Sequence, residues 1–232
     1  NFAAKGSATA FRAEYAGRSG GAGSRERGDI VQSESSFQAE VFVPVWTSQL
    51  YVNDWQRSAE APLFARVEKT GSEWTVTVQN KLDKPLTHLR LVIGSEIFDL
   101  DDVPARQMKE FTRAAAKNRR PLGNFLSQYG GQFQQVVSER RSAFGGTVSG
   151  RLNDLPNASV AASFAARLGD QGGYNSFMPA PAFDLSSAAE ADNAILLAWG
   201  EGSSPIASIN QFTPRRQQAN TLWRMTLPLH ST

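Results

Sequence analysis

Short runs in which apolar and polar residues alternate recur along the first half of the chain, with turn residues between them. The clearest pair is residues 63–68 and 74–78, which are separated by a polar, glycine-containing turn at 69–72. A period of two places alternate side chains on opposite faces of a β-strand, and a short turn joins two such strands as a hairpin. The pattern therefore predicts a mainly β fold.

The same alternation predicts further strands on both sides of this hairpin. They lie at residues 9–15, 37–45, 50–53, 86–93 and 96–100. Pro44 cannot donate a hydrogen bond to a neighbouring strand, so the strand at 37–45 is expected at an edge or a bulge. About eight short strands with regular turns are typical of a β-sandwich. We expect residues 1–111 to form a β-sandwich domain.

The composition changes after Phe111, where helical spacing replaces the alternation. Leu122, Phe125, Leu126 and Tyr129 recur at the spacing of one helix face, directly after Pro121. Proline is well tolerated in the first turn of a helix. We expect residues 112–145 to form a basic helical linker or insert.

The last part of the chain mixes both patterns. Residues 157–168 are rich in alanine and favour a helix, residues 194–199 form an apolar run typical of a buried strand, and late strands are expected at 206–212 and 221–227. We expect a smaller α+β part at 146–232 that packs on the sandwich or completes it.

The residue types that are missing narrow the possible chemistry. The 232 residues include no cysteine and only two histidines, His88 and His230. Disulfide frameworks, thiolate metal sites and sites with several imidazole ligands are therefore excluded or nearly so. No phosphate-binding P-loop occurs. We expect no catalytic residue, metal or cofactor, although carboxylates that converge only in three dimensions, as in glycosidases, leave an enzyme open.

Charge is distributed unevenly along the chain. The net charge is +2, but residues 105–141 contain eight basic and two acidic residues and carry +6. A basic surface could bind an acidic protein or anionic lipid, whereas the lack of an aromatic stacking pattern argues against nucleic acid. A solvated face with paired charges is the alternative. The candidate partner-binding residues are Arg113, Lys117, Arg119, Arg120, Arg140 and Arg141.

Three aromatic residues are candidates for a ligand-binding surface. Trp46, Tyr51 and Trp55 flank a mostly polar stretch, whereas Trp74 and Trp199 lie within apolar strand patterns and are expected in the core. Aromatic rings are amphipathic and can stack on sugars when they are exposed. A carbohydrate-binding module is therefore the alternative function, and burial at the edge of the core is the alternative interpretation of these rings.

Two segments resemble known bacterial proteins. The stretch WTVTVQNKLDKPLTHLRLVIGSEIFDLDDVPARQMKEF at 74–111 is similar to immunoglobulin-like domains of bacterial envelope proteins. The stretches AILLAWGEGSSPIASINQF and TLWRMTLPL within 194–229 resemble the extracytoplasmic parts of uncharacterised, membrane-anchored bacterial proteins. The resemblance spans about half of the chain and transfers no catalytic residue.

The resemblance implies a location and a class of function. It implies an immunoglobulin-like sandwich in the periplasm or cell envelope, anchored by a segment outside this chain. A fold by itself does not define an activity. The expected function is a non-enzymatic protein-interaction or scaffolding module with a protein partner in the envelope, and an anionic lipid surface is a second expected partner.

Overall fold

The chain forms two compact units that are built from non-contiguous segments. The computed structural model describes residues 2–5, 9–13, 28–33, 36–41, 51–55, 60–130, 154–169, 184–191, 193–202 and 219–231. The first unit contains Asn1–Glu60, Arg141–Gly146 and Ser203–Ala219, and the second contains Ala61–Arg140, Thr147–Gly202 and Asn220–Thr232. The first division therefore lies near residue 60, whereas the sequence pattern places it at 111.

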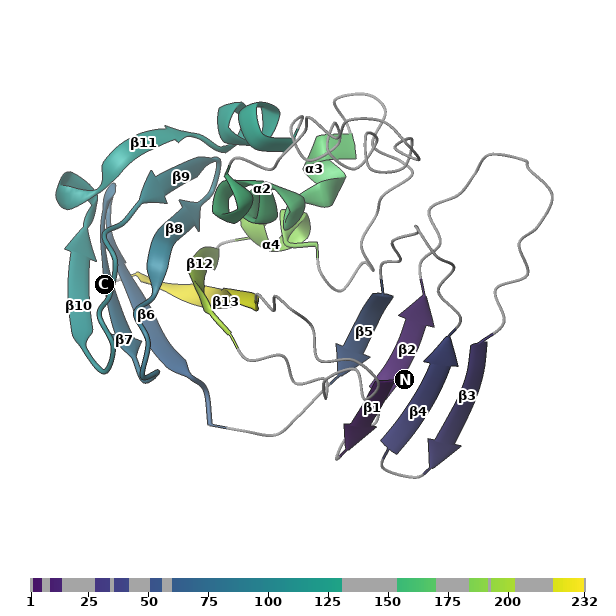
Figure 1. The fold of residues 1–232 in the computed structure, drawn as a ribbon. Coiled ribbons are helices and arrows are strands. Elements are labelled where there is room, and N and C mark those ends of the chain that lie inside the picture. The colour runs from purple at the N-terminus through teal and green to yellow at the C-terminus, as the bar shows by residue number, and fades with distance from the viewer. Residues whose placement is uncertain are drawn as a thin grey trace. The chain divides into compact units, whose positions relative to one another are not determined.

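The described part of the first unit consists of five strands. β1 (Phe2–Lys5), β4 (Ser36–Val41) and β3 (Gly28–Ser33) form an antiparallel sheet in this order, and β2 (Thr9–Ala13) pairs with β5 (Tyr51–Trp55). Figure 1 shows these strands in purple and blue. The alternating patterns predicted β2, β4 and β5, but not β1 or β3.

The second unit is built around one mixed sheet of eight strands. In chain order these are β6 (Leu63–Thr70), β7 (Glu73–Asn80), β8 (Thr87–Ile93), β9 (Glu96–Asp99), β10 (Met108–Thr112), β11 (Lys117–Pro121), β12 (Asn193–Glu201) and β13 (Asn220–Ser231). Their order in the sheet is β10-β7-β6-β13-β12-β8-β9-β11. Only the β13–β6 pair of this sheet is parallel.

The sheet is strongly curled. β10 and β11 lie at opposite ends of the strand order, yet only a short connection containing the 3-10 turn η1 (Arg113–Ala115) joins them. Inside the curl, the ring of Trp74 on β7 meets the ring of Phe98 on β9 edge-on, with centroids 5.0 Å apart. The prediction of a mainly β fold is confirmed. The eight strands belong to one continuous sheet, whereas a sandwich consists of two packed sheets.

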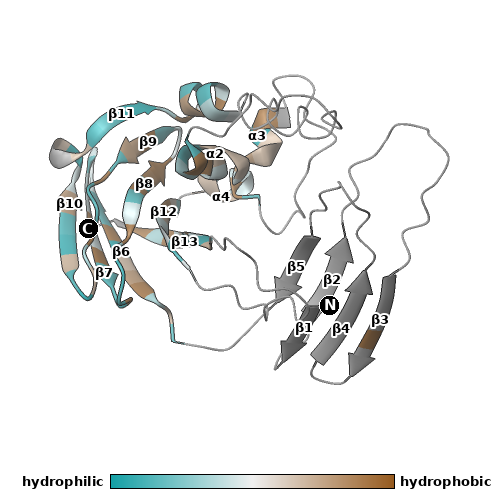
Figure 2. Cartoon of the chain, viewed as in Figure 1, coloured by the Kyte–Doolittle hydropathy of each residue, from teal (hydrophilic) through white to brown (hydrophobic). Residues whose placement is uncertain are grey.

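The neighbouring strands β12, β8 and β9 are buried on both faces. Leu91, Phe98 and Leu196 face the inside of the curl, and their neighbours Val92 and Ile97 face a layer of helices. This layer contains the helix at residues 122–130, α2 (Leu155–Ala162), α3 (Ala165–Gly169) and α4 (Ser186–Glu190). Figure 2 shows the apolar character of β8 and β9 beside the hydrophilic edge strand β11. Burial on both faces explains the near-continuous apolar run of β12.

The predicted helical insert begins as strand. Residues 117–121 form β11, which pairs with the edge of β9, and the helix starts only at residue 122. The segment KNRRP has no apolar stripe that could hold a helix on the core, while the open edge of β9 offers backbone partners. The predicted apolar face of the helix is confirmed, because Leu122, Phe125 and Leu126 are buried in the core.

The C-terminal part completes the sheet started by the earlier strands. β12 and β13 lie at its centre, between β6 and β8, and they contain the strands predicted at 194–199 and 221–227. The helix predicted at 157–168 is present as α2 and α3. The strand predicted at 206–212 lies outside the described residues. In the described part of the chain, no helix has the length and apolar character needed to cross a membrane.

Candidate functional site

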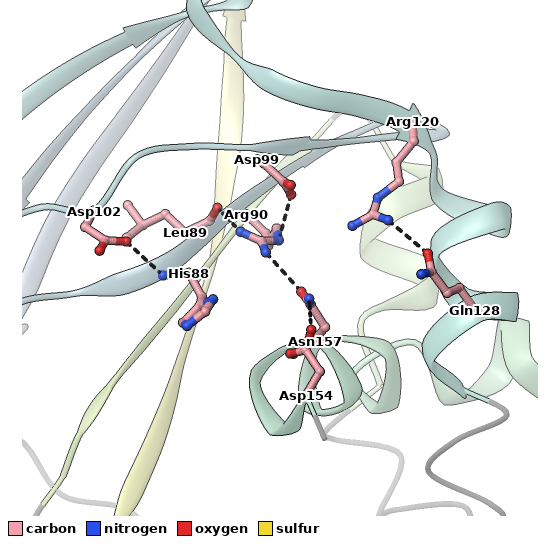
Figure 3. A network of polar contacts seen from close by, with 9 residues as sticks. All are labelled: His88, Leu89, Arg90, Asp99, Asp102, Arg120, Gln128, Asp154 and Asn157. Atoms are coloured by element: carbon pink, nitrogen blue, oxygen red, sulfur yellow. Dashed lines mark hydrogen bonds and ion pairs between the residues drawn. The ribbon is translucent and has the colours of Figure 1, made fainter. Parts of the chain in front are cut away.

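A buried arginine connects the sheet to the helix layer. Arg90 on β8 is only 7% exposed, and its Nε lies 2.8 Å from Oδ1 of Asp99 on β9. One terminal nitrogen donates to the backbone oxygen of Leu89 at 2.9 Å, and the other donates to Oδ1 of Asn157 on α2 at 3.0 Å. Figure 3 shows Arg90 between Asp99 on the sheet and Asn157 on α2. The guanidinium therefore joins the neighbouring strands β8 and β9 to α2, which lies more than 60 residues later in the sequence.

Asn157 is itself held by the start of its helix. Its amide donates to Oδ2 of Asp154 at 2.6 Å, and Oδ1 of Asp154 accepts the backbone N–H of Asn157 at 3.1 Å as the N-cap of α2. A capping carboxylate satisfies a free N–H at the first turn of a helix. The same carboxylate thus begins α2 and orients the amide that binds Arg90.

Charges around Arg90 offset part of the cost of burying it. Desolvation lowers the pKa of Arg90, and the nearby Arg120 lowers it further, whereas Asp99 and Asp154 raise it. Arg120 lies over the rings of Phe125 and Tyr129, 4.6 and 5.4 Å from their centroids, in a cation–π arrangement. The network is suited to holding β8, β9 and α2 together, because its ion pair and hydrogen bonds connect all three elements.

The basic side chains predicted to form a partner-binding surface are engaged within the chain. Lys117 pairs with Asp101 at 2.7 Å, and Nε of Arg119 donates to Glu96 at 2.8 Å. Arg113 donates to the backbone oxygen of Ser72, and Arg120 donates to Gln128 at 3.1 Å. This arrangement favours the alternative of paired charges on a solvated face. Arg140 and Arg141 lie outside the described residues.

The Lys117–Asp101 pair leads to a prediction about titration. The hydrogen bond and charge of Lys117 lower the pKa of Asp101 below its ordinary value, and Lys109 adds a smaller effect of the same sign. The pair therefore stabilises the fold fully at pH values above the ordinary carboxyl pKa. This contribution is lost as the pH falls through the lowered pKa of Asp101. In K117M, an NMR titration of the Asp101 carboxyl should show its pKa rising towards the ordinary value. K109M should cause a smaller rise, and an unchanged pKa in K117M would contradict the geometry.

A second feature lies at the opposite end of the sheet, on its outer face. Met108 on β10 pairs in register with Gln79 on β7, which pairs with Phe64 on β6. All three side chains are exposed, Met108 by 66% and Phe64 by 49%. The next row along the same strands consists of Glu110, Thr77 and Arg66. Two exposed apolar side chains therefore lie on this face, Met108 on the edge strand β10 and Phe64 two strands further in.

The backbone of β10 has groups that β7 does not use. The N–H of Asn80 donates to the oxygen of Gln107 at 2.8 Å, which makes this pair a hydrogen-bonded one in the antiparallel ladder. Bonded and non-bonded pairs alternate, so Lys109 and Phe111 bond to β7, while the N–H and C=O groups of Met108 and Glu110 point away from it. No strand of the described chain pairs with β10 on that side.

The two edges of the sheet differ in how they oppose strand addition. β11 carries Lys117 and Arg119, ends at Pro121, has a positive φ of 48° at Asn118 and shows a register shift against β9. Such charges, prolines and irregularities protect an edge against pairing. β10 has no proline and keeps an unbroken register with β7 over all five residues. β10 is therefore the more accessible edge of the two.

Comparison with protein-family models, with curated proteins and with solved structures finds no match. The interpretation of this chain therefore rests on its own residues.

Other residues singled out in the sequence are placed only in part. Tyr51 and Trp55 lie at the two ends of β5, opposite Ala13 and Thr9 of β2, and Trp46 lies outside the described residues. His88 is exposed, and its backbone N–H donates to Oδ1 of Asp102 at 3.1 Å (Figure 3). Among the described residues, no cluster of three metal-ligating side chains occurs.

Neither Arg90 nor the β10 edge was singled out by sequence reasoning. Arg90 breaks a run of apolar residues from 89 to 93, and a charged residue inside such a run was an available signal for a buried pair. The β10 edge carried no comparable signal, since which strand lies at an edge depends on pairing between distant segments.

Proposed function

We propose that this chain is a protein-interaction module that binds an extended segment of another protein along β10. The observation that carries the proposal is the unpaired edge of β10, where the backbone groups of Met108 and Glu110 point away from β7. An extended peptide can add a strand to such an edge, and its main-chain hydrogen bonds then supply affinity. The exposed side chain of Met108 supplies apolar surface at this edge.

The charged groups of the described chain support binding rather than catalysis. Arg90 and Asp99 are buried partners, and Lys117 and Asp101 neutralise each other on the surface. Catalytic groups need a shifted pKa together with room for a substrate. Among the described residues, the one markedly buried ion pair joins Arg90 to Asp99, and the other hydrogen bonds of Arg90 go to protein groups.

The proposal includes the setting that the resemblance implies. We place the module outside the cytoplasm, in the cell envelope, with an arrangement related to immunoglobulin-like domains. A chain without cysteine is compatible with an oxidising compartment, since it has no thiol to protect.

The test is a cross-linking pull-down from envelope extract, with the purified chain as bait. We expect partner cross-links at Lys109, the lysine within β10, and loss of the captured protein with E110P. Proline at residue 110 removes an outward N–H without removing a bond to β7. M108P should have the same effect.

The matched control places proline on the other edge. R119P changes the irregular part of β11 and should leave capture unchanged. Circular dichroism of each variant verifies that the fold is retained. Capture that persists in both E110P and M108P, with cross-links confined to Lys117, would contradict binding at β10.

A further inference from the structure

We infer that the segment bound by β10 carries a basic residue opposite Glu110 and an apolar residue opposite Met108, and that it belongs to a different protein rather than to a second copy of this chain. This inference rests on the proposed function. It adds the chemistry of the partner, which follows from the two outer-face rows that reach the β10 edge.

The first row selects an apolar side chain. Met108, Gln79 and Phe64 lie side by side across three strands, and Met108 is the outermost. A strand added next to β10 would place a side chain directly opposite Met108, and directly opposed side chains lie within about 5.5 Å of each other. An apolar residue at that position would cover the exposed methionine.

The second row selects a positive charge. Glu110 is exposed and is followed in its row by Thr77 and then by Arg66. Arg66 is paired with Glu68 at 3.0 Å, so it is already engaged. No ion pair joins Glu110 to another side chain of the described part of the chain. A lysine or arginine two residues from the apolar position would lie opposite Glu110 and form a cross-strand pair.

The charges of β10 oppose pairing with a second copy. In an antiparallel pair of two β10 strands about a two-fold axis normal to the sheet, a residue near the centre lies opposite itself. Centring on Glu110 or on Lys109 opposes like charges, and centring on Phe111 or Thr112 would need residues 113 and 114 in extended form, but they belong to the 3-10 turn η1. Centring on Met108 would need Arg106 in extended form, but Arg106 has a φ of 59° and pairs with Asp83. Like charges directly opposite each other destabilise a sheet.

The experiment uses three capped five-residue peptides and the full chain. The basic probe is Thr-Lys-Thr-Val-Thr, and glutamate or threonine replaces the lysine in the acidic and neutral probes. Binding is measured by the NMR signals of the Met108 methyl group and the β10 amides. We expect the basic probe to bind about fivefold more tightly than the acidic one, because attraction replaces repulsion in one cross-strand pair. E110K should reverse this order.

The outcomes separate the inference from the proposed function. Equal binding of the three probes at β10, or an order that E110K leaves unchanged, would overturn the partner chemistry while strand addition stands. Absence of any shift at β10 with all three probes would overturn the inference, and the proline variants in the pull-down would then decide the function separately. A dimer in sedimentation equilibrium that E110P abolishes would replace the hetero-partner by a second copy.

Discussion

Replacing Arg90 by methionine is expected to lower the free energy of unfolding of the second unit by about 3–5 kcal/mol. The methionine fills a similar volume but leaves Asp99 as a buried carboxylate without its cation, and it removes the hydrogen bond to Asn157. Removal of one partner from a buried pair is costly because the other charge remains desolvated. Urea denaturation followed by the methyl NMR signals of the second unit measures the change.

Two further variants show whether the effect arises from burial. R66M removes an arginine whose pair with Glu68 is exposed, so its effect should be at most about 1 kcal/mol. The double variant R90M/D99L removes both buried charges and should recover part of the stability lost in R90M. A loss below about 1 kcal/mol in R90M would show that the pair is not buried in solution.

Replacing Asn80 by alanine is expected to lower the free energy of unfolding by about 2–4 kcal/mol. Asn80 is 1% exposed, and its amide donates to the backbone oxygens of Lys84, Val103 and Pro104 at 2.9, 3.2 and 3.1 Å. Its Oδ1 accepts the N–H of Leu82 at 2.9 Å. Alanine would leave these backbone groups without their partner, which costs more than the hydrogen bonds themselves contribute.

The aspartate variant N80D tests the same contacts, and its effect on stability should depend on pH. In N80D the carboxylate would face three carbonyl oxygens, so its pKa should rise in the folded state. The destabilisation should therefore be largest at neutral pH and decrease as the pH falls below the raised pKa, where the protonated acid can donate. Q79A, at the exposed neighbouring position, should change stability by less than about 0.5 kcal/mol. A neutral N80A variant would contradict the contacts.

Local patterns predicted the elements whose burial follows a regular period. β6 and β7 alternate between buried and outward-facing residues, and Leu122, Phe125 and Leu126 form the buried stripe of the helix at 122–130. In each case the period of the apolar residues matches the period of the backbone, so neighbouring residues suffice for the prediction.

Other elements depended on partners far away in the chain. β11 is a strand because the edge of β9 is next to it, although the charged segment 117–121 has no strand pattern of its own. The importance of Asn80 follows from its contacts with Val103 and Pro104, more than 20 residues away. Propensity is a weak prior that such tertiary contacts override.

The candidate site also combines features visible in the sequence with features that depend on distant contacts. The basic residues of 105–141 were visible in the sequence, but their acidic partners Asp101 and Glu96 are brought to them only by the pairing of β9 with β11. Edge position is likewise a property of the assembled sheet, so the unpaired backbone beside Met108 could not be predicted from its own short strand.

The amino-acid sequence by itself determined the mainly β class, the helix at 122–130 and the apolar strand β12, because each depends on the periodicity of adjacent side chains. Only the tertiary structure decided that β13 lies parallel to β6, that β10 and β11 are the edges, and that Arg90 is buried against Asp99. The strand order requires hydrogen bonds between segments that are far apart in the chain, and the burial of Arg90 also involves α2, more than 60 residues later. Their formation depends on how the whole sheet assembles rather than on local preference.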